Sequence, residues 1–236
     1  MTTSLRHILV VVPARDEAET LAACLGSIID ACAVVPTAAV PSVTVTIVLV
    51  LDSCTDDSAS IAAGFPQVVV VDEDFADVGR ARGHGAALGL RLIDDDPASV
   101  WIAATDADST VPASWLRAHL DAALAGADAF VGAVVPVLGE LDDVRRAEWL
   151  RTHSPGSTLG HVHGANLGVR GDVYLRVGGF LAAATDEDVD LVRRLRTGGH
   201  VVAESEDAPV LTSSRLIGRV EGGYARYLAD LAPGLA

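Results

Sequence analysis

Short apolar runs, rich in valine, isoleucine and leucine, recur along the chain before residue 140 and are separated by polar segments. Each run has the length of a strand. Its nearly continuous apolar character is typical of a strand that is covered on both faces of a sheet. One more short run follows later. The pattern predicts strands at residues 8–12, 43–52, 67–74, 101–105, 128–138 and 164–170.

Apolar residues at helical spacing lie between these runs. The first predicted helix has an apolar face made of Leu21, Cys24, Leu25, Ile28 and Ile29. Further helices are expected over 79–93, after Pro112, and over 186–199, where acidic residues come first and arginines follow. Alternating strands and helices predict an α/β fold with a mostly parallel central sheet flanked by helices.

The pattern loosens after Val137. Residues 139–163 mix charge, glycine, proline and histidine, which predicts a functional loop or a mobile flap. Nothing in the composition marks a linker, a repeat or a low-complexity tract. We therefore expect a single domain over residues 1–236, with a regular half over about 7–138 and a looser half over about 139–236.

The charge balance limits the partners of the chain. It has 32 acidic and 17 basic residues, for a net charge of −15. Such a surface repels nucleic acid and anionic membranes, so we expect neither as a partner. An anionic ligand would need a local cation, either an arginine or a divalent metal.

Compartment is predicted from the cysteines and the hydropathy. Cys24, Cys32 and Cys54 are odd in number and form no CxxC pair, so we expect reduced thiols. No run approaches the roughly 20 apolar residues that span a bilayer. The chain is therefore expected to be cytoplasmic, with no transmembrane segment.

Polar clusters follow three of the predicted strands. They are Pro13 to Glu17, Asp52 with Ser53, and Asp106-Ala107-Asp108. In a parallel sheet the carboxyl ends of the strands form one edge, where ligands bind. Asp106 and Asp108 could both reach a hard cation such as Mg²⁺ or Mn²⁺. The alternative is a pair of turn-forming or helix-capping aspartates.

Five segments in sequence order resemble glycosyltransferase family 2, which has the GT-A fold. They are "VVVPARDEAETL" (10–21), an aspartate after the second strand, "GRARGHGAALG" (79–89), "TDADS" (105–109) and "DEDVDL" (186–191). The resemblance implies a GT-A type, Rossmann-like sheet and a metal-dependent, inverting transfer of sugar from a nucleotide-diphosphate-sugar to an acceptor hydroxyl. It also implies that the regular half binds the nucleotide and the looser half binds the acceptor.

The resemblance also assigns roles to residues. Those implied to bind the donor nucleotide are Pro13, Ala14, Arg15, Glu17, Asp52, Arg82 and Asp106. Arg15 stands where the family commonly has asparagine, and the match at Arg82 is looser because Gly83 and His84 follow it. Asp108 is implied to be the direct metal ligand, with Asp106 near the metal or the ribose. Mg²⁺ or Mn²⁺ is the implied cofactor.

The later segments match the sugar and acceptor side of the family's site. Those implied to line it are Gly164, Ala165, Asn166 and Glu187. Asp188 matches the catalytic base, which must take a proton from the acceptor hydroxyl. The alternative for the acidic run at 186–190 is charge that favours a helix N-terminus.

Several alternatives stay open from the sequence. His161 and His163 either line the acceptor pocket, contact the diphosphate or make ordinary polar contacts. Arg215 and Arg219, four residues apart, are either a phosphate clamp or a solvated helix face. An acid at Asp52 is compatible with uracil or thymine, and we favour a UDP-sugar. The acceptor, whether metabolite, glycan, lipid-linked glycan or protein, and the oligomeric state are not predicted.

Two other functions compete with the transferase. One is a protein that binds nucleotide sugars without turnover. The other is a sugar nucleotidyltransferase, which usually carries a glycine-rich basic loop after its first strand. Here that loop reads "PARDEAE", which is acidic and lacks glycine.

Overall fold

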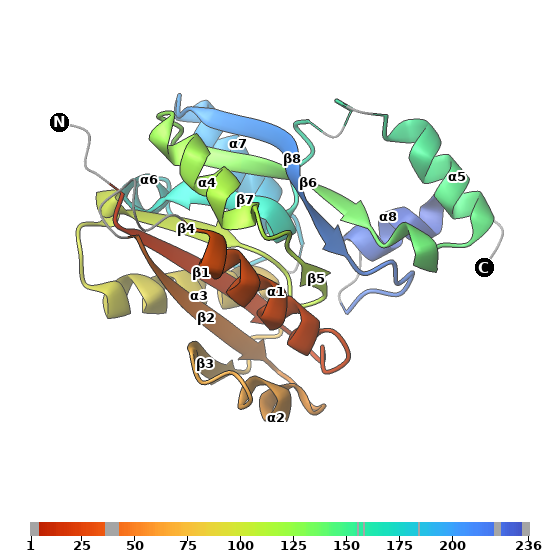
Figure 1. Ribbon diagram of the computed structural model, residues 1–236, viewed down its shortest axis with the longest axis horizontal. Coiled ribbons are helices and arrows are strands. Elements are labelled where there is room, and N and C mark those ends of the chain that lie inside the picture. Colours follow the sequence, from red (N-terminus) through yellow and green to blue (C-terminus); the bar gives the residue numbers. More distant parts are fainter. Residues whose placement is uncertain are drawn as a thin grey trace.

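The computed structural model describes residues 5–35, 43–154, 156–157, 159–183, 185–219 and 223–232. In this part of the chain eight strands form one mixed sheet, in the order β3-β2-β1-β4-β7-β6-β8-β5 (Figure 1). The strands are β1 (His7–Ala14), β2 (Thr44–Asp52), β3 (Val68–Glu73), β4 (Val100–Ala104), β5 (Ser109–Thr110), β6 (Ala129–Pro136), β7 (Leu167–Arg170) and β8 (Val202–Thr212).

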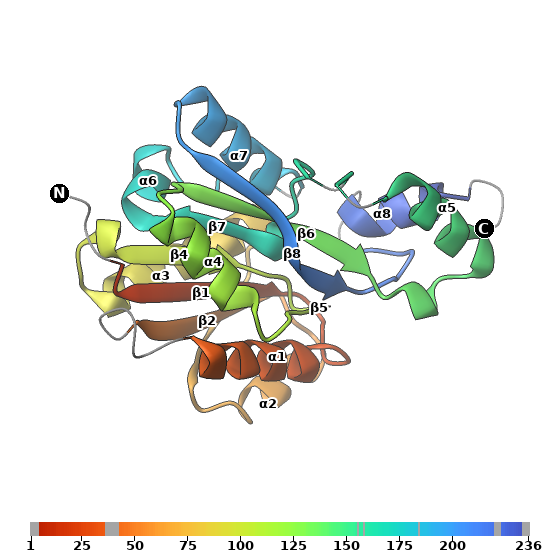
Figure 2. The ribbon, with the colours of Figure 1, turned by 45° about the horizontal axis from the view of Figure 1, so that its top comes forward.

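Strands β1 to β4 form the parallel part of the sheet, with β1 between β2 and β4. Alternate side chains of β1 enter two separate cores. Val10 faces α1 (Leu21–Val34), α2 (Ser58–Ala62) and α4 (Trp115–Leu124), whereas Val11 faces the layer of α3 (Val78–Ile93), α6 (Gly171–Arg176) and α7 (Glu187–Thr197). Burial on both faces explains why these strands have continuous apolar sequences. Figure 2 shows the helices on either side.

The other half of the sheet changes direction. β7 is antiparallel to both β4 and β6, and β5 is antiparallel to β8, whereas β6 and β8 are parallel. The predicted α/β class with helices on both faces is confirmed, and the sheet as a whole is mixed. β8 was missed because its first half, "VAESED", is largely polar and only partly buried.

Residues 139–163 differ from the predicted loop. They contain η2 (Leu138–Glu140) and α5 (Asp143–Thr152), followed by η3 (Gly164–Asn166). α5 packs beside α8 (Gly223–Asp230) at one end of the molecule (Figures 1 and 2). Leu141, Trp149 and Leu228 form a small third core there. A helix that buries only Arg145 and Trp149 of its ten residues has almost no apolar periodicity, so its sequence did not predict it.

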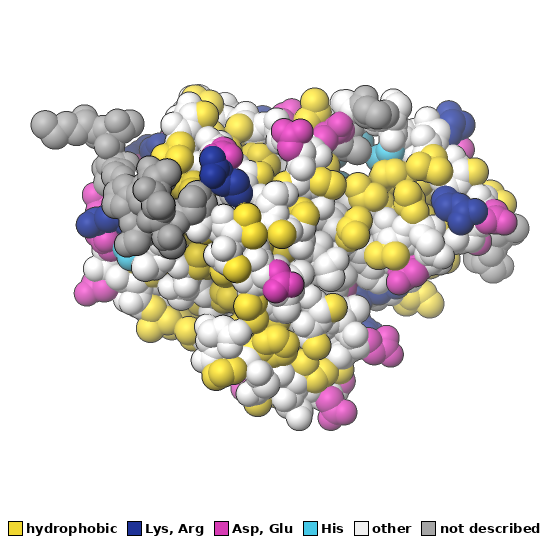
Figure 3. Space-filling view, in the orientation of Figure 1, with side chains coloured by type: hydrophobic (Ala, Val, Ile, Leu, Met, Phe, Trp, Pro, Cys, Tyr) yellow, Lys and Arg dark blue, Asp and Glu magenta, His cyan; other side chains and the backbone are white. Residues whose placement is uncertain are grey.

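On the surface drawn in Figure 3, arginines stand singly among hydrophobic and acidic side chains. None of the helices in the described ranges has the length and apolar character needed to cross a bilayer.

Candidate active site

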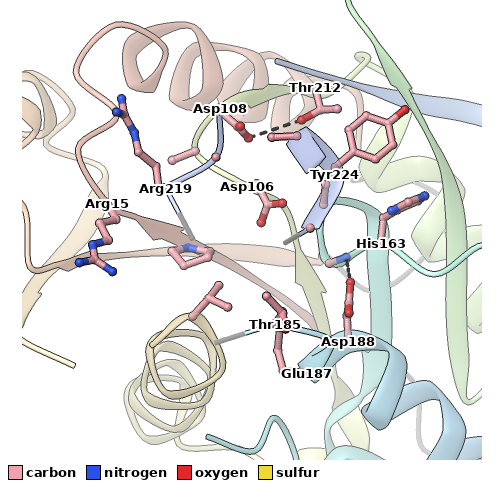
Figure 4. Close-up of a pocket in the computed structure, with 18 of the residues that line it drawn as sticks. Arg15, Asp106, Asp108, His163, Thr185, Glu187, Asp188, Thr212, Arg219 and Tyr224 are labelled. Atoms are coloured by element: carbon pink, nitrogen blue, oxygen red, sulfur yellow. Dashed lines mark hydrogen bonds between the residues drawn. The ribbon is translucent and has the colours of Figure 1, made fainter. Parts of the chain in front are cut away.

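A pocket of about 520 Å³ opens at the carboxyl ends of β1, β2 and β4 (Figure 4). The three polar clusters meet there. α7 contributes its first turn, and residues 212–219 lie across another side. All but one of the site residues expected from the sequence line this pocket. These are Pro13, Ala14, Arg15, Glu17, Asp52, Arg82, Asp106, Asp108, Gly164, Ala165, Glu187 and Asp188.

Asp52 ends β2 and is only 3% exposed. Its carboxylate accepts hydrogen bonds from the backbone amides of Phe75, Ala76 and Asp77, at 2.8, 2.8 and 2.9 Å. Asp77 caps α3 and also accepts from the amide of Ala183 at 3.0 Å. Asp52 therefore holds the loop before α3, and that loop in turn holds the segment before α7. A contact from Asp52 to a base stays a prediction.

Arg82 of α3 lies between two carboxylates. It pairs with Asp106, after β4, and with Glu187, at the start of α7. The Arg82 and Glu187 side chains are each 4% exposed, so their charges need one another. Gly164 leaves room for this arrangement, because a Cβ there would lie 2.4–2.6 Å from the guanidinium. In this conformation Arg82 ties two walls of the pocket together.

Arg215 bridges two other acids of the pocket. Its Nη1 lies 2.7 Å from Oε1 of Glu17, and its Nη2 lies 2.8 Å from Oδ2 of Asp108. Asp108 is only 13% exposed. Burial, followed by the repulsion of Asp106, raises the pKa of Asp108 to about 6, although Arg215 acts in the opposite direction.

The segment that carries Arg215 is not helical, so the expected helix face shared with Arg219 is wrong. Arg219 instead extends toward the same acid, with its Nε 3.7 Å from Oε1 of Glu17. Both arginines therefore lie on the charged side of the pocket, and neither is a purely solvated side chain.

Asp106 and Asp108 fit a divalent cation that is completed by substrate phosphates. Mg²⁺ is usually held by one or two carboxylates together with phosphate oxygens. Asp108 is paired with Arg215, which would have to turn away to leave the carboxylate to the cation. Asp106 keeps one carboxylate oxygen that is not bonded to Arg82. The donor atoms are hard oxygens, which suit Mg²⁺ or Mn²⁺.

In the described ranges, one set of three possible ligand side chains lies within 4.8 Å: Asp16, Cys54 and Asp56. Asp16 accepts from the amide of Thr55 at 2.6 Å, and Asp56 accepts from the amide of Ala18 at 2.8 Å. These contacts join the loop after β1 to the loop after β2, and they explain the lowered pKa of Asp16.

Four non-glycine residues around the pocket have left-handed backbone. Their φ angles are 52° at Asp16, 57° at Ser53, 51° at Ala76 and 63° at Asp186. Such conformations cost on the order of 1 kcal/mol each for L-residues. Each residue adjoins one that lines the pocket. The strain is therefore concentrated where the loops present functional side chains.

Asp188 is the second residue of α7 and points toward Gly164 (Figure 4). Its carboxylate accepts hydrogen bonds from the backbone amides of Gly164 and Val189. Its neighbours in the acidic run are engaged differently: Glu187 pairs with Arg82, and Asp190 pairs with arginines of its own helix. Among the described residues Asp188 has no ion-pair partner, so its charge faces the pocket.

Asn166 is the exception among the expected site residues, because it lies in the core rather than in the pocket lining. Its Oδ1 accepts from Trp115 Nε1 at 2.9 Å and faces His119 Nε2 at 3.3 Å. Its Nδ2 donates to the carbonyls of Ala133 and Ala208, at 2.9 and 3.1 Å. Asn166 thus anchors η3, which places Gly164 and Ala165 at the pocket.

Some pocket residues were not predicted from the sequence, and they lie on the side opposite Arg15 and Arg219. Tyr224 lies near His163 there (Figure 4), and Tyr227 follows one turn later on α8. Burial lowers the pKa of His163. His161 is outside the pocket lining. The three-residue spacing of the two tyrosines in "GYARYLAD" was the available signal, since it places both on one helix face.

The family model of glycosyl transferase family 2 matches residues 9–174, which is more than half of the chain. The chain belongs to glycosyltransferase family 2. A comparison with curated protein sequences finds no significant match.

Solved structures of this glycosyltransferase fold resemble the chain at low sequence identity. A mannosyltransferase from Pyrobaculum calidifontis, in complex with GDP-Man and Mn²⁺, has 20% identity and a TM-score of 0.61 over 92% of this chain and 60% of its own. Residues 1–349 of S. aureus TarS have 12% identity and a TM-score of 0.63 over 89% and 61%. TarS was also solved with UDP. The chain spans about three fifths of the length of these structures. The likeness shows a GT-A fold.

Proposed function

We propose that this glycosyltransferase moves a sugar from a nucleotide-diphosphate-sugar to an acceptor hydroxyl, with inversion and with the help of Mg²⁺ or Mn²⁺. The observation that carries the proposal is the shared pocket: acidic strand ends and the carboxylate of Asp188 face one cavity of about 520 Å³. The mannosyltransferase with GDP-Man and Mn²⁺ supports a donor of this class and a divalent ion.

The donor side of the pocket is prepared for a diphosphate. Asp108 and Asp106 would hold the cation, which neutralises the charge that develops on the leaving diphosphate. Arg215 lies beside Asp108, and Arg219 lies near Glu17; both can turn to the phosphate oxygens, because the loop that carries them is not part of a helix or strand. We favour a UDP-sugar, since the acid at Asp52 suits the N3–H of uracil, and TarS was solved with UDP.

The opposite side supplies the base. Asp188 takes the proton of the acceptor hydroxyl as its oxygen attacks the anomeric carbon. The amides of Gly164 and Val189 orient the carboxylate for this role. Attack from the side opposite the diphosphate inverts the anomeric carbon. Arg82 and Glu187 keep the start of α7 next to the donor site.

Calorimetric titration of UDP, GDP and dTDP, each with and without Mn²⁺, tests the donor class. We expect one nucleotide to bind in a Mn²⁺-dependent manner and to lose at least about tenfold in affinity in Asp108→Asn, because a charge-assisted contact is worth about 1.5–3 kcal/mol. Asp121→Asn, the same change on the exposed face of α4, is the control. Absence of binding by all three nucleotides would overturn the proposal.

The competing functions give different results in the same samples. A binding protein without turnover would bind the nucleotide but release no nucleoside diphosphate from the matching nucleotide-sugar, with or without added acceptors. A nucleotidyltransferase would form pyrophosphate from a nucleoside triphosphate and a sugar phosphate.

A further inference from the structure

Aromatic side chains form one wall of the pocket, with His163, Tyr224 and Tyr227 in its lining and Trp149 and His153 packed behind them. We call Trp149, His153, His163, Tyr224 and Tyr227 the aromatic cluster. Trp149 stacks on His153 with ring centres 4.2 Å apart and 4° between their planes. The ring centre of Tyr224 lies 5.3 Å from that of His163 and 5.7 Å from that of Tyr227. The chain has only 3 Trp and 3 Tyr, so their concentration beside the pocket calls for an explanation.

The rings of the aromatic cluster are held in place. Trp149 Nε1 donates to the hydroxyl of Tyr224 at 3.2 Å, and the hydroxyl of Tyr227 lies 3.4 Å from Nε2 of His153. Leu228 packs beneath them in the third core. Tyr227 is nevertheless 39% exposed, and it lines the pocket. The wall is therefore an ordered surface that offers a ligand aromatic ring faces as well as polar groups.

The charges around this wall disfavour an anionic ligand. The arginines of α5 and α8 each pair with an acid of the same helix or its cap: Arg145 with Asp142, Arg146 with Asp143, Arg151 with Glu148, and Arg226 with Asp230. Burial lowers the pKa of His163 and so disfavours the charged form of its ring. Together with the net charge of −15, this leaves the described part of the wall without a cation for a phosphate or carboxylate.

We propose that the aromatic cluster is the acceptor subsite, and that the acceptor hydroxyl belongs to an uncharged sugar ring. A pyranose has a flat face of C–H bonds that packs on an aromatic ring, whereas its hydroxyl edge needs polar partners. Tyr224 and Tyr227 offer the ring faces, and His163 adds a polar edge. The mix of ring faces and polar groups suits a sugar better than a hydrocarbon.

The position of the subsite matches the chemistry of transfer, so this inference rests on the proposed function. His163 directly precedes Gly164, whose amide holds Asp188. A sugar on Tyr224 therefore has its hydroxyl next to the base. The acceptor oxygen forms a bond to the anomeric carbon and gives its proton to Asp188, and the bond to the diphosphate breaks, with its electron pair leaving on the nucleoside diphosphate.

Saturation-transfer NMR tests the subsite without requiring turnover. The probes are methyl α- and β-D-glucopyranoside, methyl α-D-mannopyranoside and methyl β-D-galactopyranoside, with D-glucose 6-phosphate as the charged comparison. We expect at least one methyl glycoside to receive saturation, mainly on one ring face, and the phosphate to receive none. Tyr227→Ala should lower binding about fivefold, as expected from losing about 1 kcal/mol of aromatic contact. Tyr227→Phe, which keeps the ring, should retain it.

The outcomes separate this inference from the proposed function when nucleotide titration is done on the same variants. Binding of a nucleotide diphosphate with no binding of any glycoside would overturn the inference alone. Equal binding of glucose 6-phosphate, or glycoside binding unchanged in Tyr227→Ala, would also overturn it. Absence of nucleotide binding by the wild-type protein would instead overturn the proposed glycosyltransferase function. Circular dichroism and an unchanged nucleotide affinity verify that the Tyr227 variants are folded.

Discussion

The two walls of the pocket are held together in different ways. The wall proposed to bind the donor, here called the donor wall, is charged, and its side chains pair with one another: Arg82 with Glu187, and Arg215 with Glu17 and Asp108. The wall proposed to bind the acceptor, here called the acceptor wall, is the aromatic cluster, whose rings rest on a small core between two short helices. Glu17 and Asp108 of the donor wall follow strands of the sheet, whereas Tyr224 and Tyr227 of the acceptor wall lie on α8, at one end of the molecule. Under the proposed function, the donor wall would bind the nucleotide-sugar and the acceptor wall would select the acceptor.

The largest effect is expected where the two walls meet. Asp188→Asn should lower the rate of transfer by about 10²–10⁴-fold, because the amide cannot accept the proton. Donor binding should be unchanged, since the side chain lies outside the acidic strand ends. Steady-state release of nucleoside diphosphate together with calorimetry measures both. Asp190→Asn, on the same helix but paired with Arg193 and Arg194, should keep its activity. Full activity in Asp188→Asn would show that another group is the base.

The ion pairs of the donor wall predict a large change in stability. Arg82→Gln leaves Glu187 buried without its partner, and breaking a buried pair costs about 3–5 kcal/mol. Urea unfolding should show a lower free energy of unfolding by at least about 3 kcal/mol. Arg117→Gln breaks an exposed pair with Asp121 and should cost less than about 1 kcal/mol. Equal effects in the two variants would mean that Arg82 is not a structural tie.

Arg215 should have a smaller effect, on nucleotide binding. If it turns from Glu17 and Asp108 to the diphosphate, Arg215→Gln should weaken UDP binding by about tenfold or more, as for a charged hydrogen bond. Arg219→Gln should weaken it less, because Arg219 is 46% exposed. Unchanged affinity in Arg215→Gln would restrict Arg215 to balancing the charge of the two acids.

Near neutral pH the smallest effect is expected from the buried network under the pocket, because its contribution to stability changes only as the pH falls. His119 accepts from Trp101 Nε1 at 3.0 Å, and burial lowers its pKa to about 3. The unfolded chain therefore binds a proton below about pH 6.5 that the folded protein refuses. The stabilisation from neutral His119 is complete above that pH and falls by about 1.4 kcal/mol per pH unit toward pH 3. His119→Gln, which keeps a donor and an acceptor, should flatten this part of the curve. An unaltered slope would exclude His119 as the source.

The donor wall could be predicted from the sequence because its residues follow strands. The apolar runs located β1, β2 and β4, and the rule that ligands bind at carboxyl ends then brought Glu17, Asp52 and Asp108 together. Pairing partners were not predictable in the same way. Whether Arg82 meets a phosphate or Glu187 depends on the path of α7 and on the space left by Gly164.

The acceptor wall could not be predicted from the sequence, for a physical reason. α5 has ten residues, half of them charged, and its stability comes from contacts with α8 about 75 positions later, such as Trp149 with Tyr224. Local periodicity cannot report such a contact. Asn166 shows the same limit: the family resemblance implied a place in the pocket with Gly164 and Ala165, but the turn of η3 directs its amide into the core.

The amide of Asp77 donates to the carboxylate of Asp52, and the amide of Ala183 donates to the carboxylate of Asp77, so these hydrogen bonds connect the end of β2 to the segment before α7. A nucleotide base that displaces the Asp52 side chain would also displace the segment before α7 through these hydrogen bonds. Thermodynamic linkage then requires reciprocity: the factor by which donor changes acceptor affinity equals the factor by which acceptor changes donor affinity. Measuring donor affinity with and without acceptor, and acceptor affinity with and without donor, would test this equality. In an Asp77→Ala variant both factors should move toward one.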